Sequence, residues 1–311
     1  MTSTNGLYHV QADAKDNVQP ILHAPSALLR PSPIDEVYDI LCVGFGPASL
    51  AIAVALHDAA EAESMAEAAG KCEFSLDAPN CKKPRPFSHL RVAFLEKQHE
   101  FAWHAGMLLP GAKMQISFIK DLATLRNPRS EFTFLNYLHE KKRLVQFTNM
   151  GTFLPQRLEY EDYMRWCAQK FENLVSYGEE VFEISSGSKF GSSMDGNSNE
   201  KISYFNVVSR NMRSNSVTNR RAKNVIIAVG GKPHIPVSLP SNHPRIIHSS
   251  QFANSIPRLL PERMGSYKIA VIGAGQSAAE IFDYLMSEYP QSETKLTIRG
   301  SALRPSDDSP L

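Results

Sequence analysis

Two short glycine-containing segments constrain the fold of this chain more than any other feature. Residues 44–49 are Gly-Phe-Gly-Pro-Ala-Ser and follow the apolar run 38–43, while residues 273–278 are Gly-Ala-Gly-Gln-Ser-Ala and follow the run 268–272. A helical stretch comes after each, so both segments predict a strand, a tight turn and a helix. In that order the glycines allow the backbone to approach a pyrophosphate, which binds at the helix N-terminus. We call these segments the first and second glycine turns. They predict an α/β fold with two Rossmann-like dinucleotide-binding units.

The residue that ends the next strand predicts which ribose each unit accepts. After the first glycine turn, the run 92–95 ends at Glu96, whose carboxylate can accept hydrogen bonds from a ribose diol and would repel a 2′-phosphate. After the second, the run 295–298 ends at Arg299, whose guanidinium suits a 2′-phosphate. The chain is therefore predicted to bind FAD and, separately, NADPH. That pair of cofactors is typical of flavin-dependent oxidoreductases.

The spacing within the first unit departs from the compact pattern. Glu96 comes 52 positions after Gly44, whereas the acidic residue usually follows by about 20. Residues 71–90 are rich in proline and lysine and predict a loop insertion that accounts for the difference. The ribose role of Glu96 depends on whether its strand still lies beside the first one.

Composition excludes several classes of protein. The 311 residues carry a net charge of +1 without a basic block, so nucleic acid is not an expected partner. The N-terminus lacks a signal pattern, and the most apolar stretch, 40–56, is interrupted by glycines and a proline, so no membrane span is expected. The four cysteines form no C-x-x-C pair, which favours reduced thiols. These observations predict a cytoplasmic protein.

The pattern along the chain predicts three parts. Residues 1–35 are polar and proline-containing and predict a mobile leader, residues 36–262 an FAD-binding domain with the insertion and a β-rich part at 181–229, and residues 263–311 a partial NADPH-binding domain. Only strand, helix and strand follow residue 263, whereas a sheet of this kind normally has more strands. We therefore expect a C-terminally truncated chain, with an incomplete second unit, of a protein that forms a homo-oligomer at full length.

The segments between the glycine turns contain longer motifs, which are more specific to one family than the glycine turns are. Those that carry a resemblance are 94–97, 101–104, 107–111, 113–122 and 153–160. They resemble the flavin-dependent N-hydroxylating monooxygenases, specifically the fungal L-ornithine N5-monooxygenases of siderophore biosynthesis. The likeness extends from about residue 38 to the end of the chain.

The resemblance implies roles for individual residues, none of them an acid–base catalyst or a metal ligand. Those implied for FAD, together with the first glycine turn, are Gly44, Gly46, Ser49, Glu96, Lys97, Phe101, Trp103, His104, Gln115 and Val181. Those implied for NADPH are Gly273, Ala274, Gly275, Gln276, Ser277 and Arg299, with Arg157 at the nicotinamide half. Lys120 is implied to bind the carboxylate of the amino-acid substrate.

The implied reaction uses NADPH, FAD and dioxygen. NADPH reduces FAD, dioxygen then gives a C4a-hydroperoxyflavin, and the side-chain amine of L-ornithine takes up the distal oxygen. The cofactor carries this chemistry while the protein orients the reactants and excludes water. Two alternatives stay open at this point. One is an inactive truncated fragment, and the other is a different two-dinucleotide flavoprotein, of the lysine N-hydroxylating or Baeyer–Villiger type.

Overall fold

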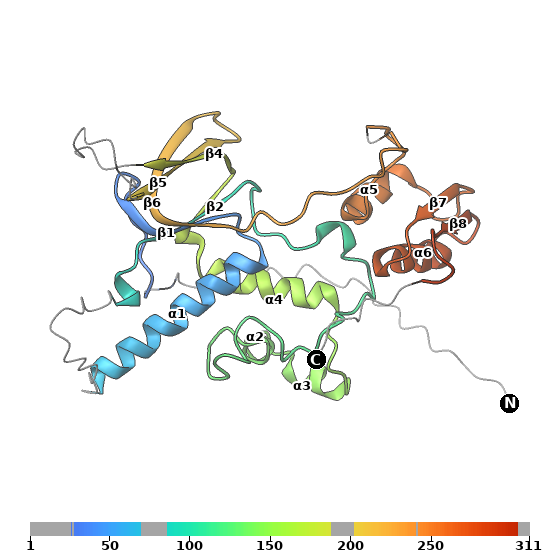
Figure 1. The fold of residues 1–311 in the computed structure, drawn as a ribbon. Helices are drawn as coiled ribbons and strands as arrows, with labels where there is room; N and C mark the ends of the chain where they lie inside the picture. The colour runs from blue at the N-terminus through green and yellow to red at the C-terminus, as the bar shows by residue number, and fades with distance from the viewer. Residues whose placement is uncertain (1–25, 27, 70–85, 188–201, 241, 304–311) are drawn as a thin grey trace.

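The computed structural model describes residue 26 and residues 28–69, 86–187, 202–240 and 242–303 (Figure 1). Most of the predicted insertion, with Cys72 and Cys81, falls outside this described part, as does the end of the chain after residue 303. The described residues form a six-stranded mixed sheet with helices and a separate two-stranded parallel sheet. The predicted α/β fold with two Rossmann-like units is confirmed.

The large sheet has the strand order β3-β2-β1-β6-β5-β4. Its parallel part contains β1 (Val37–Val43), β2 (Val92–Glu96) and β3 (Val175–Tyr177). All five residues of β2 are buried, as expected for a parallel strand that is covered on both faces. The apolar runs 38–43 and 92–95 thus form the adjacent strands that the sequence predicts.

The β-rich part continues the same sheet. Its strands are β4 (Glu179–Gly187), β5 (Tyr204–Asn211) and β6 (Val217–Ile227), and they pair in antiparallel order. β6 pairs with β5 through its first half and runs parallel to β1 through its second half, from Arg221 to Ile227. This double pairing joins the β-rich part directly to the first glycine turn.

Helices and short 3-10 turns pack around the parallel strands. They are α1 (Pro47–Ala68), α2 (Phe134–Glu140), α3 (Leu144–Asn149) and α4 (Arg157–Gln169), with η1 (Phe87–His89), η2 (Ala105–Met107) and η3 (Glu172–Leu174). α1 and α4 lie beside each other under the sheet (Figure 1). The core between them is rich in aromatic side chains, which include Phe132, Tyr163 and Trp166. Leu29, within the predicted leader, is buried in this core.

The second unit follows an extended connection (Figure 1). It consists of η4 (Ser249–Gln251), α5 (Phe252–Leu259), β7 (Lys268–Ile272), α6 (Gln276–Glu288) and β8 (Glu293–Thr297). The predicted strand 268–272 is confirmed. β8 begins and ends earlier than the predicted run 295–298, so Arg299 lies two residues beyond the strand.

The small core of the second unit includes residues from both parts of the chain. Phe252 and Ile256 of α5 pack with Leu285 of α6, and Met107 and Leu109 from the first part are buried among them. The segment around residues 105–110 therefore belongs structurally to the junction between the two units. Among the described residues, no helix has both the length and the apolar composition that a membrane crossing requires.

Candidate functional site

The first glycine turn has the backbone geometry of an anion site. Gly44 has φ +94°, and a Cβ there would lie 2.4 Å from the carbonyl oxygen of Ala228, so only glycine fits. Gly46 is the N-cap of α1, and nothing lies within 4 Å of a Cβ built on it. No side chain caps α1, and its first turn has no acidic residue. Its free N–H groups and open approach fit a pyrophosphate.

Glu96 lies beside this turn despite the long insertion. β1 and β2 pair in parallel with Val43 opposite Leu95, which places the end of β2 next to the glycines. The Phe45 N–H donates to Glu96 Oε2 at 2.7 Å, and the Gln98 N–H donates to Oε1 at 2.8 Å. Each oxygen retains a further lone pair. Despite the spacing of 52 residues, the Glu96 carboxylate therefore lies beside the first glycine turn.

Ser49 lies under the turn. Its side chain is fully buried in the first turn of α1, near Cys42 of β1. Burial raises the pKa of the Cys42 thiol to about 11, and the Ser49 hydroxyl acts in the opposite direction. The Ser49 side chain is thus enclosed by protein at the N-terminal turn of α1. Cys42 and Cys167 are both buried free thiols.

An aromatic segment follows β2. Phe101 is buried and packs edge-on against Phe45 of the glycine turn, with ring centroids 6.2 Å apart. The centroid of the Trp103 ring lies 5.0 Å from that of His104 and 5.9 Å from that of Tyr160. His104 has the left-handed φ of 46°, a conformation that is costly for histidine and that occurs often at functional sites.

The His104 imidazole also has an altered acidity. The residue is largely exposed, but the part of the ring that packs against protein is desolvated, and this lowers the pKa of His104. The positive charge of Arg157 lowers the pKa further. The neutral imidazole is favoured as a result. A neutral imidazole can serve as both hydrogen-bond donor and acceptor.

Three other predicted FAD residues lie at more open positions. Lys97 is exposed and pairs with Glu180 at 2.6 Å, which ties the end of β2 to β4. This hydrogen bond and the lysine charge lower the pKa of Glu180. Val181 follows in β4 and is half-buried, and Gln115 is exposed in the loop after η2.

Lys120 extends from a tightly bonded loop. Its own side chain is exposed, and its ammonium has no ion-pair partner among the residues that the structure describes. The next residue, Asp121, accepts backbone hydrogen bonds from Ala123 at 2.9 Å, Thr124 at 2.6 Å and Phe134 at 2.7 Å. The Tyr160 hydroxyl donates to the carbonyl of Lys120 at 3.3 Å. A free cation on a fixed loop fits the binding of a carboxylate.

Asp121 was not among the residues predicted from the sequence. A local signal exists for part of this pattern, because an aspartate side chain commonly accepts hydrogen bonds from the backbone N–H groups two and three residues after it in a turn. The bond to Phe134, thirteen positions away, has no such signal.

The second glycine turn repeats the geometry of the first. Gly273 has φ +146°, and its N–H donates to the carbonyl of Thr297 at 3.0 Å, next to the end of β8. Gly275 is the N-cap of α6, and a Cβ there would meet nothing within 4 Å. α6 has no side-chain cap and no acidic residue in its first turn. This N-terminus also fits a pyrophosphate.

The remaining predicted NADPH residues surround this turn. Ala274 is half-buried, whereas Ser277 and Arg299 are exposed. Gln276 begins α6 and donates through Nε2 to Glu280 Oε1 at 2.7 Å. Arg299 lies two residues after β8, and its guanidinium has the charge and shape that suit a 2′-phosphate.

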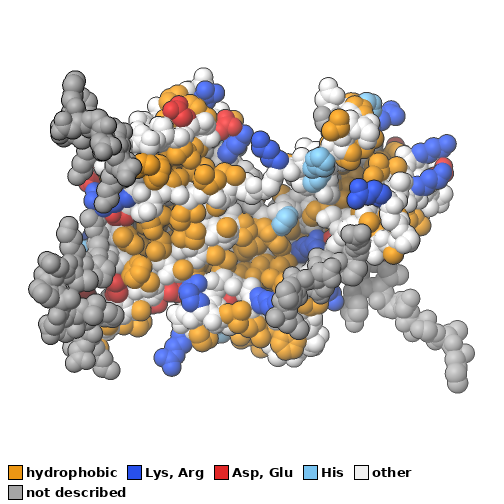
Figure 2. All heavy atoms as spheres, in the orientation of Figure 1, with side chains coloured by type: hydrophobic (Ala, Val, Ile, Leu, Met, Phe, Trp, Pro, Cys, Tyr) orange, Lys and Arg blue, Asp and Glu red, His pale blue; other side chains and the backbone are white. Residues whose placement is uncertain are grey.

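Arg157 lies at the junction of the two units. It is the first residue of α4, and its guanidinium donates to both carboxylate oxygens of Glu280 on α6, at 2.6 and 2.8 Å. Figure 2 shows apolar side chains gathered between the large sheet and helices α1 and α4, with basic and histidine side chains toward the second unit. The sequence named Arg157 for the nicotinamide half but gave no sign of its partner Glu280, which is 123 positions away.

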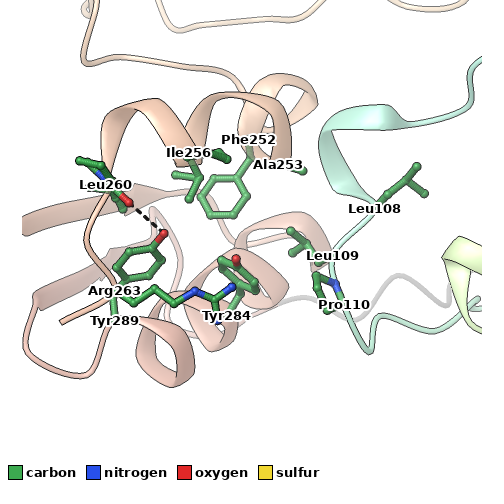
Figure 3. A pocket seen from close by; sticks show the side chains of 12 residues that line it. Leu108, Leu109, Pro110, Phe252, Ala253, Ile256, Leu260, Arg263, Tyr284 and Tyr289 are labelled. Carbon is green, nitrogen blue, oxygen red and sulfur yellow. Dashed lines mark hydrogen bonds between the residues drawn. The ribbon is translucent and has the colours of Figure 1, made fainter. Parts of the chain in front are cut away.

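A groove of about 310 Å³ lies elsewhere in the junction (Figure 3). Leu108, Leu109 and Pro110 line one side, and residues of α5 and α6 line the other, including Phe252 and Tyr284. None of the predicted cofactor or substrate residues lines this groove. The groove therefore lies apart from the residues assigned to the nucleotide sites.

One buried cluster on α1 has the residue types of a metal site. His57, Asp58 and Glu61 have ligand atoms within 4.8 Å of one another. The Asp58 carboxylate is already used, because it accepts from the Ser130 hydroxyl at 2.7 Å and pairs with the Arg126 guanidinium. An arginine on the same carboxylate opposes a cation there, so we assign this cluster to the packing of α1.

The fold and the two turns define a protein with two Rossmann-type dinucleotide units in one chain. Residues 36–311 match the model of the family described as L-lysine 6-monooxygenase/L-ornithine 5-monooxygenase, and the chain belongs to that family. It is 56% identical to an L-ornithine N(5)-monooxygenase of Cochliobolus heterostrophus and 52% identical to one of Aspergillus oryzae. Each match includes 91% of this chain and, respectively, 50% and 52% of the relative. The chain thus spans about half the length of these curated relatives.

Solved structures show the same relationship. The ornithine hydroxylase of Pseudomonas aeruginosa superposes with a TM-score of 0.69 at 37% identity, over 88% of this chain and 58% of that one. The ornithine N-hydroxylase of Kutzneria sp. 744, solved with reduced FAD, NADP+ and L-ornithine, gives a TM-score of 0.69 at 33% identity, over 89% and 56%. Both are similar to this chain in fold and in sequence.

Proposed function

We propose that this protein hydroxylates the side-chain amine of L-ornithine in the cytoplasm, with FAD and NADPH, as a step of siderophore biosynthesis. The observation that carries the proposal is the pair of uncapped glycine turns, with Glu96 beside the first and Arg299 close to the second. The names of the relatives support ornithine as the substrate.

The residues around the first turn would hold FAD. The backbone at Gly44, Gly46 and the start of α1 would bind the pyrophosphate, and Glu96 the ribose. Those that would line the rest of the cofactor are Ser49, Lys97, Phe101, Trp103, His104, Gln115 and Val181. When bound, FAD supplies the redox and oxygen chemistry.

The residues around the second turn would hold NADPH. Gly273, Ala274, Gly275, Gln276 and Ser277 would bind the pyrophosphate at the N-terminus of α6, and Arg299 would bind the 2′-phosphate. Arg157 would support the nicotinamide half from the N-terminus of α4. The division into residues 36–262 and 263–311, and a homo-oligomeric assembly, stay predictions.

Lys120 would orient the substrate. A carboxylate of ornithine paired with its ammonium leaves the side-chain amine directed away from the loop, and the bonded Asp121 turn keeps that pairing in one place. The Tyr160 hydroxyl, bonded to the carbonyl of Lys120, and the Trp103 ring in contact with Tyr160 would support this loop from the side of α4.

The test is product formation by the purified native protein. With FAD, NADPH and dioxygen, L-ornithine is expected to give N5-hydroxyornithine and to couple NADPH oxidation to product. L-lysine is the matched alternative, because the family includes lysine 6-monooxygenases. Equal or greater hydroxylation of lysine would refute the assignment of ornithine, and absence of both products would refute N-hydroxylation.

A further inference from the structure

An ion pair between α4 and α6 joins the two dinucleotide units. Arg157 and Glu280 form two parallel hydrogen bonds, and their side chains are only 14% and 20% exposed. Bidentate guanidinium–carboxylate pairs have a defined geometry, so they fix orientation as well as distance. Removing one member of such a shielded pair leaves an unpaired charge, which is far more costly than the loss of an exposed pair.

Both members of the pair lie next to predicted cofactor residues. On α6, the same Glu280 carboxylate accepts the Gln276 amide, and Gln276 directly follows the N-cap Gly275. On α4, Arg157 is the first residue of the helix, and its charge acts on His104. The contact therefore connects the start of α6 to the region where the flavin residues gather.

A second connection runs through the chain between η2 and α4. The Arg157 N–H donates to the carbonyl of Ala112 at 2.8 Å, and Leu109, three residues earlier, is buried in the core of the second unit. Close packing at Gly106 reinforces this, since a Cβ there would lie 1.9 Å from the carbonyl oxygen of Ser250. The junction thus has an apolar part and one shielded, directional polar contact.

We propose that Glu280 is a positioning residue for the transfer between the two cofactors. By holding the Arg157 guanidinium and the Gln276 amide together, it fixes the N-terminus of α6 against the N-terminus of α4. The relative placement of the two dinucleotide sites follows from that contact. This inference rests on the proposed function for its catalytic consequence, whereas the docking itself does not depend on any activity.

The first test measures docking in the protein without added nucleotide. Glu280→Gln keeps the shape of the side chain and removes its charge. Amide hydrogen exchange should accelerate in residues 105–112 and in the first two turns of α6. The matched control is Glu288→Gln, because Glu288 pairs with Arg263 within the second unit and those side chains are 34% and 68% exposed. The control should leave the exchange of both segments unchanged.

The second test measures anaerobic reduction of bound FAD by saturating NADPH. Glu280→Gln should lower this rate by about 10- to 100-fold, the loss expected from a small misplacement of reactants. FAD content and the Kd of L-ornithine should stay at wild-type values. A role in general stability would instead lower FAD content in parallel with the rate. Glu280→Asp, which keeps the charge, should recover part of the rate.

A double-mutant cycle with Arg157→Gln separates the pair from other effects. If Glu280 docks the units through Arg157, Glu280→Gln should have no further effect on the exchange of residues 105–112 once Arg157 is glutamine. Additive losses would overturn the proposal, as would unchanged exchange in Glu280→Gln. If wild-type protein is not reduced by NADPH, the proposed function fails, and the exchange comparison alone then decides whether Glu280 docks the units.

Discussion

Gly44 and Gly46 are separated by one residue, yet an added methyl group should strongly lower stability at Gly44 and change it little at Gly46. At Gly44 the backbone is left-handed, with φ +94°, which costs an L-residue about 1–2 kcal/mol. The new Cβ would also lie 2.4 Å from the Ala228 oxygen and 3.3 Å from Val229 Cα, and both are backbone atoms. Forcing that contact costs about 1–3 kcal/mol more.

The free energy of unfolding should therefore fall by about 2–5 kcal/mol in Gly44→Ala, a large part of the roughly 5–15 kcal/mol of a typical domain. At Gly46 the backbone is extended, with φ −85°, and the methyl would meet nothing within 4 Å. Gly46→Ala should change the free energy of unfolding by less than about 1 kcal/mol, because the reduced freedom of the unfolded chain is opposed by the lower preference for alanine at an N-cap.

Urea unfolding of the FAD-free protein, followed by far-ultraviolet circular dichroism, measures both changes. Titration with FAD then tests the site: the Gly46 methyl would stand on the open side of the α1 N-terminus, so FAD affinity should fall at least about tenfold, or 1.4 kcal/mol. A stable Gly44→Ala variant would refute the strain argument. Wild-type FAD affinity in Gly46→Ala would refute the placement of the pyrophosphate.

Three further substitutions or conditions test other residues. Arg299→Ala should raise KM for NADPH much more than KM for NADH, because the lost contacts are those to the 2′-phosphate; equal effects would exclude this role. Lys120→Ala should weaken L-ornithine binding by about 1.5–3 kcal/mol while NADPH still reduces the flavin, and loss of reduction with unchanged ornithine affinity would contradict it. Burial raises the pKa of Cys42 from 9.0 to about 11, so the folded state binds more protons than the unfolded state in that interval. The contribution of this thiol to stability should therefore be lost as pH rises from 9 toward 11, and Cys42→Ala should flatten that part of the pH profile.

The sequence predicts the strands and helices whose structure depends on residues that are near one another in the chain. The apolar runs before each glycine turn form β1 and β7, and each helix begins where its last glycine ends the turn. Residues 161–167 have the apolar period of an amphipathic helix and lie within α4, from Arg157 to Gln169. These features depend on hydrophobic period and on the allowed φ of glycine, which a single sequence displays directly.

Other features depend on distant partners. β3 has three half-buried residues and is a strand only because β2 lies beside it, so no pattern of its own predicts it. The position of Glu96 follows from the pairing of Val43 with Leu95, which sequence spacing obscures. The contact between Arg157 and Glu280 requires the two helices to be docked, and nothing in either local sequence marks it.

The central claim is that one chain holds two dinucleotide sites with opposite ribose preferences. The most direct measurement is anaerobic reduction of bound FAD in the native protein, with NADPH and NADH compared at equal subsaturating concentrations. The structure predicts that the protein binds FAD and that NADPH reduces it much faster than NADH, and that Arg299→Ala removes most of this difference. Failure to bind FAD, or equal rates with the two nucleotides in the wild-type protein, would contradict the account.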